Sequence, residues 1–291
     1  EGCAPCHDLG RVACPQHSAA ELALERNALR CSYRKSCATC GGRLSVDCGA
    51  CTRGEEVAVA ERALAQRLEH DAARYSEALG RAAPFAASAH FNLVSTLPAT
   101  KAEKRRVNAH ELVHVYLDRL EAAQQAYLEL FALPADALDV RSEVFLWSAS
   151  ADHVRVGQAV CLYESMDPLF RRGPDIAAVS LWFDPSKLAD DDALHRQVVH
   201  HVAHGLMNAE PPPAWTGQLH VGWIDEGFPL WFEQRFLGST TGFCTWPTEQ
   251  TRALRAGQFR AAVRKHVDSG EAFDLERFLA LDPPAMSRLE Q

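Results

Sequence analysis

CAPCHDLGRVACPQH, residues 3–17, and CATCGGRLSVDCGAC, residues 37–51, share one layout of metal-ligand side chains. In each stretch two ligand pairs of the CxxC or CxxH type are separated by seven residues. Zinc favours four sulfur or nitrogen ligands in a tetrahedron, and each pair can direct two ligands at one point. The repeat therefore predicts two zinc sites, one of Cys3, Cys6, Cys14 and His17 and one of Cys37, Cys40, Cys48 and Cys51.

Eight of the ten cysteines lie between Cys3 and Cys51, which favours metal binding over a disulfide scaffold spread through the fold. Two alternatives stay open. Cys3-Ala4-Pro5-Cys6-His7 also fits the CxxCH motif of c-type haem attachment, and the same cysteines could pair as disulfides in an exported protein. Cys31 is left over and is interpreted as a buried thiol between the two stretches.

Both stretches resemble the CxxCxGxG knuckles in the cysteine-rich region of DnaJ-type chaperones. Gly10, Gly41 and Gly42 lie at or next to the glycine positions of that pattern, whereas Asp8 and Leu44 replace two of its glycines. The resemblance covers this module alone and does not imply chaperone activity. It implies two structural zinc ions, whose binding supplies the folding energy that so short a segment does not obtain from a core.

The composition of the 291-residue chain is that of a globular protein of about two domains, with 47% apolar and 23% charged residues. The formal net charge of -8 argues against general nucleic-acid affinity. No apolar run is long enough for a membrane span. The start at Glu1 suggests a soluble protein exported after signal cleavage, whereas thiolate zinc sites favour a reducing compartment, so the localisation stays open.

Periodicity predicts three parts: a double zinc-knuckle module at 1–53, a helical linker at 54–88 and an α+β domain at 89–291 with a small mixed sheet. The expected strands are HFNLVST (90–96), RSEVFLWSA (141–149), QAVCLYES (158–165) and IAAVSLWFD (176–184). The expected helices span 55–80, 103–132, 191–208, 224–236, 250–265 and 274–281.

His110-Glu111-Leu112-Val113-His114 is an HExxH sequence, in which two histidines share one helix face and can bind zinc while the glutamate acts as a general base. The helix around it continues without a break that could deliver a third ligand. His110 and His114 are therefore the less favoured metal pair, and the alternative is a polar edge of an amphipathic helix.

A second pair with the same spacing is His200 and His204, in HHVAH, followed by Trp223-Ile224-Asp225-Glu226-Gly227. Here residues 90–282 resemble the gluzincin metallopeptidases, in which HExxH is followed by a helix that brings a glutamate as third zinc ligand. The resemblance implies a metallopeptidase-like fold with active-site helices. It also implies that His200, His204 and Glu226 bind zinc and that Asp225 and Glu233 orient these ligands.

The chain departs from the gluzincin pattern at His201, where the family has its catalytic glutamate, and at Pro229. That carboxylate is the general base of the family. Histidine can exchange protons near pH 7, but it is shorter, and beside a cation its neutral form is favoured. Alternatively, His201 and His204, which are three positions apart, form the metal-binding pair.

We therefore expect a metallopeptidase-like protein with two structural zinc ions and one at the central site, and with impaired or lost peptide hydrolysis. Two alternatives remain: an active zinc-dependent peptidase, and a non-enzymatic module that binds a peptide or protein partner and holds only structural zinc. The family pattern also leads us to expect a further helix after the last residue of this chain.

Overall fold

The computed structural model describes residues 3–138, 141–162, 164, 169–173, 176–187, 190–207, 222–240 and 259–270. Its main sheet has six strands in the order β2-β4-β5-β8-β10-β9. These strands are β2 (Arg30–Cys31), β4 (Phe85–Ala87), β5 (Phe91–Ser95), β8 (Ser142–Trp147), β10 (Ile176–Trp182) and β9 (Leu169–Gly173). Two small two-stranded sheets pair β1 (Arg11–Ala13) with β3 (Ser45–Asp47) and β6 (Thr100–Ala102) with β7 (Arg105–Val107).

The centre of the main sheet is parallel and its edges are antiparallel. Strand β8 pairs in parallel with β5 and with β10, and Ser142 lies opposite both Phe91 and Ala177. Strands β2, β4 and β9 complete the sheet through antiparallel pairs. The expected mixed sheet is thus confirmed, and its central strands are continuous apolar runs because both faces are covered.

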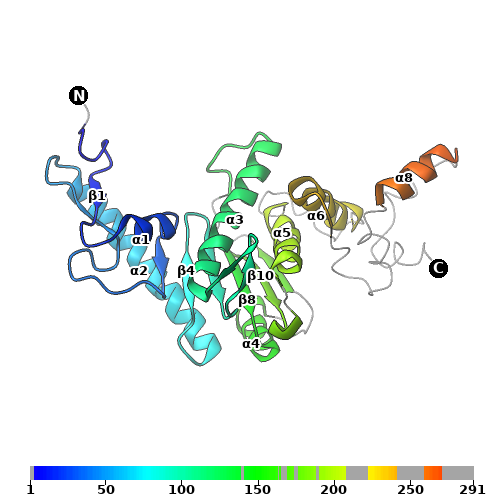
Figure 1. The fold of residues 1–291 in the computed structure, drawn as a ribbon, viewed down its shortest axis with the longest axis horizontal. Coiled ribbons are helices and arrows are strands. Elements are labelled where there is room, and N and C mark those ends of the chain that lie inside the picture. Colours follow the sequence, from blue (N-terminus) through cyan, green and yellow to red (C-terminus); the bar gives the residue numbers. More distant parts are fainter. Residues whose placement is uncertain are drawn as a thin grey trace.

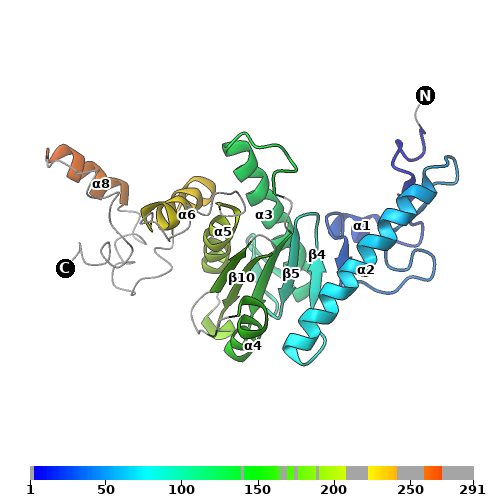
Figure 2. The same ribbon diagram turned by 180° about the vertical axis from the view of Figure 1, so that it is seen from behind.

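Helices cover both faces of the sheet. Leu93, Val144 and Val179 belong to the core cluster beneath α3 (Ala109–Leu130) and α5 (Asp192–Met207). Their neighbours Val94, Phe145 and Ala178 belong to the cluster beneath α2 (Gly54–Leu79) and α4 (Ser150–Val156). This alternation follows from the period of two along a strand. Figure 2 shows α2 and α4 in front of the sheet, and Figure 1 shows α3 on the opposite side.

The remaining described helices are short α1 (Ala19–Leu24), the π-helix η1 (Gly157–Cys161), the 3-10 helix η2 (Pro185–Lys187), α6 (Gly222–Leu237) and α8 (Phe259–Asp268). Among the described helices, none is long and apolar enough to cross a membrane.

The expected helices at 55–80, 191–208 and 224–236 are confirmed as α2, α5 and α6. The helix expected at 103–132 starts later, at Ala109, because Asn108 caps it and the preceding residues form the β6–β7 hairpin. Of the helix expected at 250–265, the structure describes α8, and the helix expected at 274–281 lies outside the described residues.

The strand expected at 158–165 was wrong. Residues Gly157–Cys161 continue α4 as a π-helix, which ends at Leu162 in a left-handed conformation with φ +59°. Val160 and Cys161 are buried in the core cluster beneath α2 and α4. A short apolar run fits a strand and a buried helical turn equally well, and here tertiary burial selects the helix.

Two elements of the N-terminal third of the chain, β2 and α2, pack on the main sheet. Strand β2 adds Arg30 and Cys31 to the edge of the main sheet beside β4. Helix α2, expected as a linker, buries Leu68, Tyr75 and Leu79 on that sheet. It ends at Gly80, whose φ of +69° favours glycine.

Candidate metal centres

Two clusters of four ligands lie in the N-terminal module. Within each cluster the candidate ligand atoms all lie within 4.8 Å of one another. The first consists of Cys3, Cys6, Cys48 and Cys51, and the second of Cys14, His17, Cys37 and Cys40. Sulfur–sulfur distances of 3.8 Å for Cys3–Cys48 and 3.7 Å for Cys6–Cys51 suit a tetrahedral thiolate site.

The partnership within each site differs from the one expected along the sequence. Each site takes one ligand pair from residues 3–17 and one from residues 37–51, instead of both pairs from one stretch. The cause is the antiparallel pairing of β1 with β3, which sets Val12 opposite Val46. This pairing brings the start of the first stretch to the end of the second.

Backbone conformation around these sites explains the glycines and their replacements. Gly10, Gly41 and Gly42 all have positive φ, and a Cβ on Gly10 would lie only 3.0 Å from Val57 Cγ2 and 3.1 Å from the Arg53 oxygen. Asp8 and Leu44, which replace glycines of the knuckle pattern, adopt φ +64° as well. The turns therefore keep the left-handed geometry without a glycine at every position.

Local hydrogen bonds prepare some of these cysteines to bind a cation. Burial raises the pKa of Cys40, but hydrogen bonds from His17 and from the Leu44 amide outweigh it and lower that pKa to about 6. The pKa of Cys6 is likewise lowered to about 7 against the effect of burial, by Cys3 and the Gly10 backbone. The pKa values of Cys3, Cys14 and Cys51 in the same sites are raised instead, so the fit of both donor sets to zinc rests on the type and spacing of the ligands.

A third cluster joins this module to helix α3. Glu25, Cys31, His110 and His114 also place one ligand atom each within 4.8 Å of the others. Glu25 follows α1, Cys31 lies in edge strand β2, and the two histidines lie in the first two turns of α3. The Glu25 Oε1 atom lies 2.8 Å from His110 Nε2 and 3.5 Å from His114 Nε2.

Neighbouring side chains hold this cluster in place. The buried Arg34 side chain donates from Nε to Glu25 Oε2 at 2.8 Å and from its other nitrogens to the carbonyl oxygens of Gly42 and Ala28. Tyr33 stacks on the His110 ring at a centroid distance of 5.4 Å. Burial raises the pKa of Glu25, but hydrogen bonding to His114 and the charge of Arg34 outweigh it and lower that pKa to about 2.

The glutamate of the HExxH sequence takes no part in the cluster. The Glu111 carboxylate accepts a hydrogen bond from the Asn108 amide at 3.0 Å and from Arg105 at 3.3 Å. Glu111 is thus the N3 residue of a capping box. His110 and His114 are recognisable from the HExxH sequence, whereas Glu25 carries no motif that marks it as their partner, and Cys31 was expected only as a buried thiol. Cys31, which belongs to neither knuckle stretch, was the one feature of the sequence that could have indicated this cluster.

The central histidines are buried side chains of α5, and His200 faces α6. His200, His201 and His204 are at most 3% exposed, and the rings of His200 and His204 are 5.0 Å apart. Glu233, on α6, is fully buried with its Oε2 atom 3.5 Å from His200 Nδ1. His201 Nδ1 lies 2.8 Å from the Gln197 carbonyl oxygen, so the ring is held to its own helix.

Glu226 and Asp225 fall within α6, but their side chains lie outside the described residues. The assignment of Glu226 as third ligand therefore stays a prediction. Pro229 lies inside α6, seven positions after Gly222, and the helix continues through it to Leu237.

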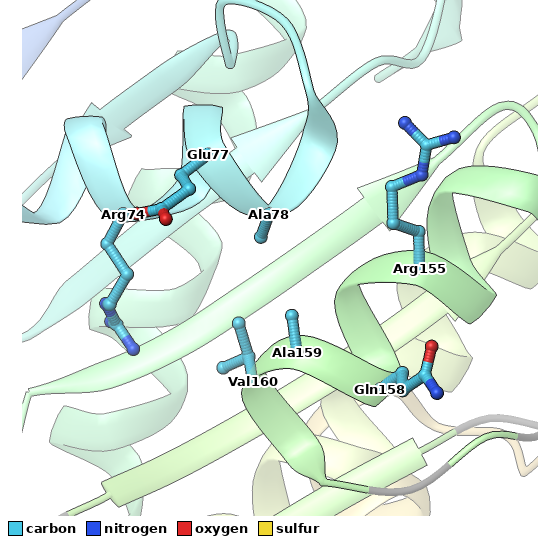
Figure 3. Close-up of a pocket in the computed structure, with 7 residues that line it drawn as sticks. All are labelled: Arg74, Glu77, Ala78, Arg155, Gln158, Ala159 and Val160. Atoms are coloured by element: carbon cyan, nitrogen blue, oxygen red, sulfur yellow. The ribbon is translucent and has the colours of Figure 1, made fainter.

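A pocket of about 550 Å³ lies between α2 and the α4–η1 segment. Figure 3 shows Arg74 and Arg155 at its two sides with Ala78, Ala159 and Val160 between them. Both arginines have protein partners, since Arg74 pairs with Glu143 and Arg155 donates to the Leu79 carbonyl at 2.6 Å. None of the residues in the three clusters lines this pocket.

Comparisons with protein-family models, with curated proteins and with solved structures find no match to this chain.

Proposed function

We propose that this chain is a metallopeptidase-like zinc protein. Its central site would bind zinc through His200, His204 and Glu226, and its peptide hydrolysis would be impaired or lost. The observation that carries the proposal is the buried contact between α5 and α6, where the His200 ring meets the Glu233 carboxylate. Imidazole and carboxylate groups are rarely gathered in a buried helix interface unless they serve a site.

The chemistry of the donors fits zinc. His200 and His204 are four residues apart on α5, so they share one helix face. Glu226 precedes Glu233 by seven positions on α6, close to two helical turns. Glu233 would then accept the Nδ1–H of His200, an outer contact that fixes the ring for metal binding through Nε2. Bound zinc would supply Lewis-acid activation of a peptide carbonyl.

Impairment follows from the residue at position 201. An imidazole there has at most one basic nitrogen, because Nδ1 donates to the Gln197 carbonyl oxygen. A glutamate would instead offer two carboxylate oxygens on a flexible stem. His201 is also 3% exposed, which limits proton exchange with solvent.

The metal-binding half of the proposal is tested by counting zinc ions per chain with native mass spectrometry. We expect the His200→Ala/His204→Ala double variant to hold one ion fewer than the wild type. His70→Ala, at an exposed position of α2, is the control and should leave the count unchanged. An equal count in the double variant and the wild type would overturn zinc binding at this site.

The catalytic half is tested by His201→Glu, assayed on a mixture of fluorogenic peptides. We expect hydrolysis to rise at least tenfold over wild type, because a general base contributes about 10²–10⁴-fold. The control is His201→Gln, because glutamine is as long as glutamate but has no carboxylate. This variant should show no gain in hydrolysis. A zinc-loaded His201→Glu protein without hydrolysis would count against a peptidase cleft and favour the partner-binding alternative.

A further inference from the structure

We propose that Glu25, Cys31, His110 and His114 form a further zinc site, which fastens the N-terminal module to helix α3. The inference does not depend on the central site, because it uses none of the residues on α5 or α6. It gives the HExxH sequence of α3 a structural role in place of a hydrolytic one.

The four donor atoms lie close enough together to surround one ion. Ligand atoms about 2.0–2.3 Å from a zinc ion lie roughly 3.3–3.8 Å from one another. The four candidate atoms here lie within 4.8 Å of one another, and Glu25 Oε1 is 3.5 Å from His114 Nε2. Small side-chain movements would therefore suffice to enclose an ion. One thiolate, two imidazoles and one carboxylate form a donor set that zinc accepts.

The burial of these side chains is a second indication of a metal site. Glu25, Cys31 and His114 are 4–6% exposed, and the buried Nε2 atom of His114 has only a long contact of 3.5 Å with Glu25 Oε1. A buried carboxylate, thiol and imidazole pointing at one another are costly to remove from water unless they are well paired. A divalent cation between them would satisfy the His114 nitrogen and the thiol together.

Two catalytic interpretations of the same residues fit less well. Cys31 as a nucleophile would need access to substrate, yet the thiol is buried in the strand at the edge of the sheet. Hydrolysis through HExxH would need Glu111 beside the metal, but that carboxylate caps α3 and contacts Arg105. Four protein ligands also leave no open position for a substrate, which is the arrangement of structural zinc sites.

The site lies where such an ion can join separate parts of the chain. Glu25 and Cys31 come from the segment between the two knuckle stretches, and His110 and His114 come from the start of α3. Arg34 links Glu25 to the carbonyl oxygen of Gly42, next to the Cys37/Cys40 turn. An ion bound here would thus hold the second knuckle, the edge strand β2 and α3 in one arrangement.

Native mass spectrometry of the folded full chain tests the proposal through ligand variants. We expect His110→Gln/His114→Gln and Cys31→Ser/His114→Gln to hold one zinc ion fewer than wild type. The matched control is Cys161→Ser/His195→Gln, which replaces another buried cysteine and another partly buried histidine away from the cluster. This control should keep the wild-type count. A full count in both ligand variants would overturn the proposal.

Crystals of the zinc-loaded wild type provide a measurement that does not depend on the folding of any variant. Anomalous difference maps recorded above and below the zinc absorption edge should show a peak between Cys31 Sγ and His114 Nε2, in addition to two knuckle peaks. Two knuckle peaks without one in this cluster would overturn the site.

The same data separate this proposal from the proposed function. Loss of an ion in His200→Ala/His204→Ala reports on the central site alone, whereas loss in His110→Gln/His114→Gln reports on the cluster at α3. The experiments can therefore contradict zinc binding at one site and support it at the other.

Discussion

Glu25 and His110 meet across the boundary between the N-terminal module and helix α3, with Glu25 Oε1 2.8 Å from His110 Nε2. The two residues are 85 positions apart in the sequence. The same carboxylate receives Arg34 through its other oxygen. A single buried glutamate therefore connects the knuckle region, through Arg34, to the first turn of a core helix.

The buried Glu25–Arg34 pair should be important for stability. Replacing Arg34 with alanine leaves the buried Oε2 atom of Glu25 without its hydrogen-bond donor. It also removes the hydrogen bonds to the carbonyl oxygens of Gly42 and Ala28. Breaking a buried ion pair from one side costs about 3–5 kcal/mol. We expect Arg34→Ala to lower the free energy of unfolding by an amount of this order, measured by urea denaturation of the zinc-loaded protein.

Arg26→Ala is the matched control for that experiment. Arg26 pairs with Asp118 at 3.4 Å, and both side chains are largely exposed to solvent. An exposed pair contributes about 0–1 kcal/mol, so the stability should hardly change. Similar losses for the Arg34 and Arg26 variants would contradict the assignment of Arg34 as a buried partner.

The ligand partnership in the knuckles can be determined with double variants. Cys6→Ala/Cys48→Ala damages one site of the structure, whereas Cys6→Ala/Cys14→Ala damages both. We expect the first variant to lose one zinc ion and the second to lose two, counted by native mass spectrometry. The partnership expected along the sequence predicts the reverse order, so the two arrangements give opposite results.

Removal of metal should unfold the module locally and leave the main sheet intact. Structural zinc contributes apparent binding energies of about 10–16 kcal/mol, and residues 3–53 have few large buried side chains to replace it. We expect a strong chelator to abolish amide-exchange protection in β1 and β3 while β5, β8 and β10 remain protected. The measurement is hydrogen exchange followed by mass spectrometry, with and without chelator. Unchanged protection in β1 and β3 would contradict a metal-dependent module.

His195 should contribute a defined pH dependence. Burial, followed by the charge of Arg119, lowers the pKa of His195 from 6.5 to about 4, although Asp191 acts in the opposite direction. The unfolded chain therefore binds more protons than the folded chain between about pH 6.5 and pH 4. The contribution of this histidine to stability is complete above pH 6.5 and declines as the pH falls through that window.

His195→Gln removes this titration and should reduce the loss of stability between pH 7 and pH 5. The measurement is urea unfolding at both pH values, and the relevant quantity is the difference between wild type and variant. Other acid-sensitive groups, including the zinc ligands, are common to both proteins. An identical pH dependence in the two proteins would show that His195 titrates near its ordinary pKa.

Several elements were predictable because their patterns are local. The amphipathic period of 55–80 determines α2, and the apolar runs around Leu93, Val144 and Val179 determine the central strands. The residue types and spacing of the CxxC pairs likewise identified the knuckle ligands. Side-chain period and ligand spacing depend only on neighbours along the chain, so they can be recognised without a structure.

Long-range partnership was decided by the tertiary structure alone. The pairing of β1 with β3 selects which cysteine pairs share a site, and the pairing of β2 with β4 brings Cys31 beside α3. Residues 158–161, the start of a run expected as a strand, belong to the π-helix η1, because a helical turn buries Val160 and Cys161 against α2 and the sheet as well as a strand would. The sequence by itself therefore determined most of the candidate metal ligands, the long helices and the central strands β5, β8 and β10. Which ligands meet was decided only by strand pairing and burial between residues far apart in the chain, because such contacts leave no local period to recognise.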